Sequence, residues 1–223
     1  MRIIIAAAAL AAVSVLSTPA QAEEHQGKWQ VKLLGSAVLP DGKITRVDED
    51  AVGLPGTLQT KANDNYVPTV AIEYFFTDNI SVETICCVTQ HDVDGTAGLP
   101  GAELVADAKI IPATLTLKYH LDAGAIRPYI GAGPTYFIFV DEQPGADAVD
   151  LGATGLRLND KLGLALQAGV DVPLGSNGML LSLDAKKYFL ETSAHWFVND
   201  TEVIATRNNL DPWVLSAGVG FRF

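Results

Sequence analysis

Residues 211–223 read DPWVLSAGVGFRF, and this final stretch decides the fold. From Trp213 to Phe223 every second side chain is apolar, whereas Gly218, Gly220 and Arg222 on the opposite face are small or polar. A period of two is that of a β-strand, whose successive side chains point to opposite sides of the sheet. The stretch therefore predicts a strand between two very different environments.

The same alternation recurs along the chain and predicts eight strands. They are Trp29–Leu39, Tyr66–Phe76, Ile80–Val88, Lys109–Tyr119, Ile126–Val140, Asp160–Val172, Met179–Leu190 and Asp211–Phe223. Four long connections, at 40–65, 89–108, 141–159 and 191–210, alternate with three short ones. Short turns at one rim and long loops at the other are typical of outer-membrane barrels. An even number of strands permits closure, which leaves no unpaired sheet edge in hydrocarbon.

Alternation alone does not say which face of the sheet is inward, because a secreted soluble barrel or sandwich would bury its apolar face. Aromatic residues near the predicted strand ends favour a membrane barrel with girdles at both interfaces. These residues are Trp29, Tyr74, Phe76, Tyr119, Trp213, Phe221 and Phe223. The predicted fold class is therefore all-β, an eight-stranded antiparallel transmembrane β-barrel with short periplasmic turns and long extracellular loops.

The N-terminus has the pattern of a secretory signal peptide. Arg2 is followed by an apolar run to Leu16 and then by Ala20-Gln21-Ala22, a small-x-small cleavage site. An anchoring helix is the alternative, but the run is too short and too rich in alanine. We therefore expect residues 1–22 to be a signal peptide and residues 23–223 to form the barrel.

Composition excludes two classes of protein. Hydrophobic residues make up 48% of the chain and charged residues only 18%, which excludes an intrinsically disordered chain. The net charge of −11 and the scattered basic residues argue against nucleic acid as a partner, because phosphate binding needs clustered Lys and Arg.

Acidic residues concentrate in the long loops, which hold 16 Asp and Glu against 5 Lys and Arg. A solvated rim explains this charge, and divalent cations that bridge to lipopolysaccharide are the functional alternative. We predict no metal site and no cofactor.

If the apolar faces contact lipid, charged side chains face the lower lumen as an ion-paired plug. They are Lys32, Glu73, Glu83, Lys118, Arg127, Asp171 and Arg222, with Asp184 somewhat higher. Glu73 and Glu83 face one another across the turn at Asp78, so this pair requires a cation between the two carboxylates.

Toward the outer end the inward positions become apolar and predict a cup that holds a small apolar ligand. They are Val38, Val67, Ile85, Phe137, Phe139 and Tyr188. An eight-stranded barrel is only wide enough to be filled by side chains or to hold one small ligand. Pro68, Pro112 and Pro134 each remove a ladder donor and either weaken a strand seam or mark strand ends and bulges.

Cys86 and Cys87, the two cysteines of the chain, are adjacent. On a strand they point to opposite faces, so free thiols and a strained vicinal disulfide both remain open. A metal site is disfavoured, because no His or second Cys pair lies nearby.

Three segments together resemble the outer membrane protein W (OmpW) family of Gram-negative bacteria. They are YFFTDNISVE at 74–83, RPYIGAGPTY at 127–136 and GVGFRF at 218–223. The resemblance implies a narrow hydrophobic channel for small hydrophobic compounds, a role in stress adaptation and, in some members, service as a bacteriocin receptor. It also implies a location in the outer membrane and recognition of the last strand, with Phe221 and Phe223, by the barrel-assembly machinery.

Two functions of different class follow. The first is a narrow channel or binding cup for small hydrophobic solutes, with lateral release to the bilayer. The second is a structural, adhesive or receptor barrel that acts through its acidic loops without transport. The expected surroundings are outer-membrane lipid and lipopolysaccharide. Catalysis is disfavoured, because the four histidines lack a Gly-x-Ser-x-Gly partner motif.

Overall fold

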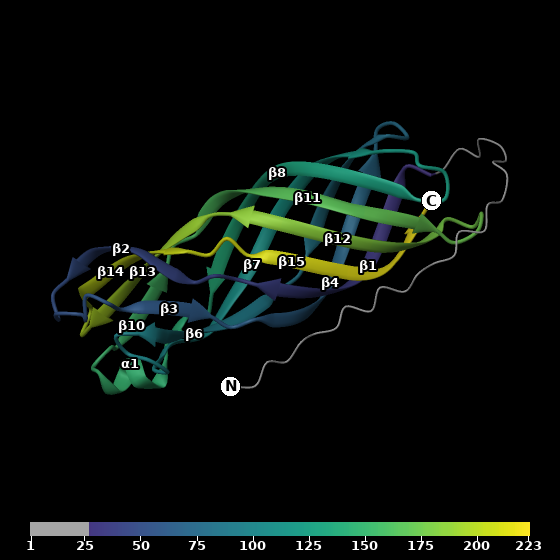
Figure 1. The fold of residues 1–223 in the computed structure, drawn as a ribbon. Helices are drawn as coiled ribbons and strands as arrows, with labels where there is room; N and C mark the ends of the chain where they lie inside the picture. The colour runs from purple at the N-terminus through teal and green to yellow at the C-terminus, as the bar shows by residue number, and fades with distance from the viewer. Residues whose placement is uncertain (1–26) are drawn as a thin grey trace.

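The computed structural model describes residues 27–223, so the predicted signal peptide at residues 1–22 lies outside the described residues. The regular elements of the described chain are strands, apart from one helix of five residues, α1 (Ala146–Asp150) (Figure 1). No helix in this part of the chain is long and apolar enough to cross a bilayer.

Eight strands form a closed antiparallel barrel. They are β1 (Trp29–Leu39), β4 (Asn65–Phe75), β5 (Ile80–Cys86), β7 (Glu103–His120), β8 (Arg127–Val140), β11 (Lys161–Pro173), β12 (Met179–Phe189) and β15 (Trp213–Arg222). Each pairs with the next in this order, and β15 pairs with β1 from Arg222↔Gln30 to Trp213↔Leu39. The last pairing closes the cylinder, so the backbone groups at both edges find partners. All eight predicted strands and the fold class are confirmed.

The long connections contain structure that the sequence analysis treated as loops. They hold β2 (Lys43–Asp50), β3 (Gln59–Ala62), β6 (Thr89–Ala97), β9 (Gln143–Pro144), β10 (Gly155–Leu158), β13 (Glu191–Val198), β14 (Thr201–Asn209) and α1. β3, β6 and β9 extend the barrel sheet through β7, whereas β10, β13, β14 and β2 form a second sheet in that order. Figure 1 shows these elements gathered at the end of the barrel opposite the C-terminus.

The apolar face of the barrel strands points outward, as the aromatic positions predicted. Leu33 is 61% exposed and Leu162 is 72% exposed, whereas the inward neighbours Lys32 and Gln167 are buried. A soluble barrel would show the reverse distribution, because water would then contact the outer face. The hydrophobic surface therefore suits acyl chains, and the polar groups find their partners inside.

Aromatic side chains surround the rim that carries the C-terminus. Trp29 contacts Tyr74 with ring centroids 4.9 Å apart, and Tyr74 contacts Phe76 at 5.3 Å. Phe221 and Phe223 stack at 5.8 Å and face outward. Their role as an assembly signal stays a prediction.

Candidate functional site

A cluster of buried ions fills the lower lumen, and we call it the charged floor. It consists of Lys32, Glu73, Glu83, Lys118, Asp171, Asp184 and Lys186, together with the polar side chains Gln30, Thr116, Tyr129 and Gln167. These side chains come from seven of the eight barrel strands and meet because alternate residues of each strand point inward. All of them are buried.

The centre of the charged floor is a pair of like charges held by lysines. Glu73 and Glu83 are register partners on β4 and β5. The Lys118 ammonium lies 2.9 Å from a carboxylate oxygen of Glu73 and 2.8 Å from one of Glu83. Lys32 lies 3.4 and 3.6 Å from the same two oxygens and 3.1 Å from Asp171. The cation that this carboxylate pair requires is therefore supplied by the chain itself.

Lys186 extends the cluster upward, and the sequence analysis missed it. Its ammonium lies 3.0 Å from Glu83 and 2.9 Å from Asp184. Gln167 donates to both of these carboxylates, at 2.9 and 2.6 Å, and the Tyr129 hydroxyl donates to Asp184 at 2.7 Å. Lys186 lies two residues after Asp184 on β12, so its inward direction could have been read from that spacing.

Two arginines predicted for the plug lie outside the cluster. Arg222 packs over the Phe75 ring at 3.6 Å, and its guanidinium is 3.8 Å from Asp78. Arg127 donates to the Asp78 backbone carbonyl at 2.5 Å and is only partly buried. Both arginines therefore line the periplasmic rim below the floor, next to the turn that joins β4 and β5.

Below the centre, a serine, a histidine and a glutamate meet without forming a catalytic triad. His120 Nε2 lies 2.8 Å from Glu73 and 2.9 Å from the Ser81 hydroxyl. Ser81 itself donates to Glu73 at 2.5 Å. In a triad the serine and the carboxylate contact opposite ring nitrogens, so that the imidazole can take the serine proton. Here both contact the same nitrogen, and the serine proton is already donated to the carboxylate.

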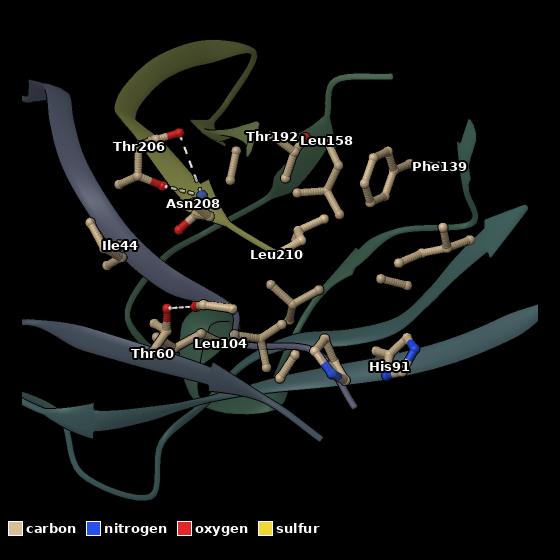
Figure 2. A pocket seen from close by; sticks show the side chains of 18 of the residues that line it. Ile44, Thr60, His91, Leu104, Phe139, Leu158, Thr192, Thr206, Asn208 and Leu210 are labelled. Atoms are coloured by element: carbon tan, nitrogen blue, oxygen red, sulfur yellow. Dashed lines mark hydrogen bonds between the residues drawn. The ribbon is translucent and has the colours of Figure 1, made fainter. Parts of the chain in front are cut away.

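Above the charged floor lies a cavity of about 400 Å³, which we call the apolar cup. Five of the six predicted ligand residues line it, namely Val38, Ile85, Phe137, Phe139 and Tyr188. Val67, the sixth, packs against their cluster. The Phe137 and Tyr188 rings meet edge to face, with centroids 5.3 Å apart. The extracellular elements continue this lining upward through residues such as Leu104, Leu158 and Leu210 (Figure 2).

Polar side chains in the upper cup mostly bond to the protein (Figure 2). Thr60 donates to the Gly42 carbonyl at 2.5 Å, and Asn208 donates to the Thr206 hydroxyl at 3.0 Å. His91 contacts the Asn63 carbonyl at 2.7 Å, and burial lowers its pKa below the ordinary value. The imidazole is therefore neutral at pH 7, and the cup offers apolar surface without a free charge at this height.

The barrel wall beside the cup has a gap in its hydrogen-bond ladder. Pairing with β7 stops at Ile85 in β5 and resumes at Thr89 in β6. Residues 86–88 consequently have no ladder partner on β7 within the described range. Pro112, which has no backbone N–H, lies opposite this segment by register.

The β4 side of the gap is open as well. The last β4–β5 pair is Val70↔Cys86, so Thr69 and Cys87 are the next residues along the two chains. Thr69, Cys87 and Pro112 line the apolar cup, whereas Val88 is 53% exposed on the outside. We call residues 86–88, Thr69 and Pro112 together the wall break.

The three prolines considered as weak points behave differently. Pro112 faces the wall break, and Pro68 lies on its β4 flank while it pairs with Gly35 on β1. Pro134 lies at a second interruption, where β7–β8 pairing skips two positions between Thr114↔Thr135 and Leu117↔Ala132. That interruption is level with Thr116, which bonds to Gln167 of the charged floor at 2.7 Å, so it does not open onto the cup.

Both cysteines are free thiols. Cys86 is exposed on the outer face and Cys87 is buried against the cup, as alternation along a strand predicts. Within residues 27–223, no group of three or more His, Cys, Asp and Glu side chains could hold a metal ion.

Comparison with known proteins identifies the family. A model of the OmpW family matches residues 25–223. The chain belongs to the OmpW family. It is 34% identical to the uncharacterized outer-membrane protein y4mB of Sinorhizobium fredii, over 96% of this chain and 90% of that protein. It is 30% identical to outer membrane protein W of Escherichia coli, over 97% of each chain.

Solved structures support the same assignment. The crystal structure of OprG from Pseudomonas aeruginosa is similar with a TM-score of 0.76 and 25% identity, over 88% of this chain and 96% of that one. The structure of AlkL in lipid bilayers has the same fold, with a TM-score of 0.69 and 24% identity over 95% and 97% of the two chains. The family predicted from the sequence and the location in the outer membrane of a Gram-negative bacterium are confirmed. These relatives are named as membrane proteins and not as enzymes.

Proposed function

We propose that this OmpW-family barrel takes small apolar molecules from outside into the apolar cup and releases them sideways into the bilayer through the wall break. The observation that carries the proposal is the combination of an apolar cup, a charged floor below it and a gap in the ladder at the level of the cup. Beside the cup, the wall break is therefore the weak part of the described side wall.

The lining favours apolar solutes. Transfer of apolar surface out of water stabilises a solute by about 25 cal/mol per Å². A solute that buries roughly 200 Å² would therefore gain about 5 kcal/mol, before the cost of its lost freedom. The cavity of about 400 Å³ lies in the range of ordinary small-molecule sites.

The charged floor opposes passage straight through the barrel. A solute that moved downward would have to separate Lys118 from Glu73 and Glu83, and Lys186 from Glu83 and Asp184. Breaking one buried ion pair costs about 3–5 kcal/mol, and several would break together. Movement toward the periplasm is therefore more costly than movement through the wall.

The wall break is the place where strands separate most easily. Elsewhere, parting two strands in hydrocarbon exposes backbone groups at several kcal/mol each. The described structure has no ladder pair between residues 86–88 and β7, where Pro112 brings no donor, and none between Thr69 and Cys87 on the β4 side, which is the side we propose as the exit. On the outside, Val88 meets the lipid directly, so a released solute would pass from apolar cup to apolar membrane.

A reversible staple across the wall break tests this route. Thr69→Cys, in a Cys86→Ser background, puts a second thiol next to Cys87 on the facing strand. Neighbouring positions on adjacent antiparallel strands are close enough for a disulfide. Uptake of a labelled alkane is measured in vesicles whose outer leaflet is lipopolysaccharide, with the same protein oxidised and then reduced.

We expect the oxidised protein to lose at least nine-tenths of its protein-dependent uptake and to recover on reduction. The Cys86→Ser protein without the second substitution is the control, and its uptake should be the same before and after oxidation. Equal uptake by the oxidised and reduced forms, with the disulfide verified by mass, would refute release between Thr69 and Cys87.

A further inference from the structure

We infer that the hydroxyl of Thr69 is a specificity determinant, which favours uncharged aliphatic molecules that bear one alcohol or carbonyl oxygen over plain hydrocarbons. The inference rests on the proposed function, because it assigns a solute class to the same exit. It concerns a side chain that lines the apolar cup and also borders the wall break.

Thr69 differs from the other threonines of the cup in its hydrogen bonding. Its side chain is 4% exposed, and its hydroxyl has no hydrogen-bond partner of ordinary geometry among residues 27–223. The other threonines that line the cup bond to protein partners: Thr60 to Gly42 at 2.5 Å, Thr89 with His91 at 2.8 Å, Thr192 to Asn159 at 2.7 Å, and Thr206 with Asn208 at 3.0 Å.

The Thr69 hydroxyl does face one polar side chain, but that group is a poor substitute for a partner. It is the Cys87 thiol, on the residue that follows β5. A thiol is a weak donor and a weak acceptor, so it leaves the hydrogen-bonding capacity of the hydroxyl largely unused. A buried hydroxyl in that state is unfavourable, and any group that bonds to it is stabilised.

The position of Thr69 puts this capacity on the proposed route. When the strands at the wall break part, a solute that leaves the cup passes between Thr69 and Cys87. An alcohol or carbonyl oxygen on the solute can bond to the hydroxyl there, whereas a hydrocarbon leaves the hydroxyl without a partner. A charged head group remains disfavoured, because the cup lining is apolar and its lysine, Lys186, is already paired with two carboxylates.

The test compares 1-decanol with decane, which share a chain length and differ in one hydroxyl. Protein-dependent uptake of each is measured in vesicles with a lipopolysaccharide outer leaflet, after subtraction of uptake by protein-free vesicles. Loss of one neutral hydrogen bond corresponds to about a three- to tenfold change in a rate or binding constant. We therefore expect Thr69→Val to lower the decanol-to-decane uptake ratio by about three- to tenfold, and Thr69→Ser to keep it within about twofold.

The matched control is Thr84→Val, on the strand next to Thr69. Thr84 faces the lipid, does not line the cup, and donates to the Thr114 carbonyl at 3.0 Å. This change should leave the ratio unaltered. An unchanged ratio in Thr69→Val, or an equal fall in Thr84→Val, would overturn the assignment while leaving the proposed function intact. Absence of protein-dependent uptake for both solutes would overturn both proposals.

A measurement on the unsubstituted protein keeps the assignment testable if Thr69→Val does not fold. Folding is checked first by the heat-dependent gel mobility that folded barrels show. The unsubstituted protein should take up decanol more than three times faster than decane, relative to the partition of each into protein-free vesicles. A preference for decane would refute the role of Thr69.

Discussion

Replacement of Lys118 by methionine probes the charged floor most directly. The substitution removes the ammonium at 2.9 and 2.8 Å from Glu73 and Glu83 and keeps a side chain of similar length. At an effective dielectric constant of about 20, each lost attraction is about 6 kcal/mol before desolvation is considered. Relief of the lysine's own desolvation offsets much of this, and Lys32 still lies 3.4 and 3.6 Å from the two carboxylates. We expect a net loss of about 3–5 kcal/mol in the free energy of unfolding.

The assay is reversible urea unfolding of the barrel in phospholipid vesicles, with the folded fraction read from gel mobility. Adding Glu83→Gln to Lys118→Met removes one of the orphaned charges, so the double variant should be more stable than the sum of the single losses predicts by at least about 1 kcal/mol. Lys43→Met is the control, because Lys43 is exposed and lies 3.5 Å from Asp41 alone, and it should change the stability by less than about 0.5 kcal/mol. A loss below about 1 kcal/mol in Lys118→Met, or strict additivity in the double variant, would show that the floor is not an interlocked ion cluster.

Gly169→Val should destabilise the barrel by about 1–3 kcal/mol in the same urea assay, because a Cβ there would lie 2.4 Å from the Tyr129 hydroxyl. An unaffected midpoint would contradict this close contact. Phe137→Asp should reduce the uptake of decane by at least tenfold in a barrel that still folds, because it puts a charge in the apolar cup; normal uptake would remove the cup from the route. A hydrogen bond from Arg207 holds the pKa of Asp48 below its ordinary value of 3.8, so their contact contributes stability above that value and loses it as the pH falls through the lowered pKa. The protection factors of the β2 amides, which are corrected for the intrinsic exchange rate at each pH, should therefore fall below about pH 4, and Asp48→Asn should abolish this fall; the same fall in that variant would refute the assignment.

The barrel could be predicted from the sequence because a wall between lipid and polar lumen forces a period of two on every strand. The Glu73↔Glu83 pairing followed from the short turn at Asp78, which fixes the register of its two strands. Lys186 was not predicted, although it lies two residues after Asp184 and therefore points to the same side of the strand. The sequence of β2, KITRVDED, has polar residues on both faces, because the strand stands in water, so alternation could not reveal it.

The position of the wall break could not be predicted from the sequence for a different reason. Pro68, Pro112 and Pro134 looked equivalent, since each lacks a donor. Pro112 differs from the other two because it lines the cup and lies opposite residues 86–88, which lack ladder partners on β7, and this gap is a property of three strands together. The Thr69 hydroxyl likewise lacks a partner because the pairing between β4 and β5 ends beside it, and no local sequence pattern shows where that pairing ends.

The length of β7 sets how far the extracellular end of the barrel wall projects above the membrane. Its 18 residues, at about 3.3 Å each and tilted by about 40°, rise roughly 45 Å, whereas the apolar band of such barrels is about 25 Å tall. Roughly 20 Å of wall thus projects above the acyl region, through the layer where the phosphates and inner sugars of lipopolysaccharide lie. A hydrophobic molecule that follows the proposed route from the extracellular end would not have to dissolve in that hydrophilic layer, which is the part of the envelope that otherwise excludes hydrophobic compounds.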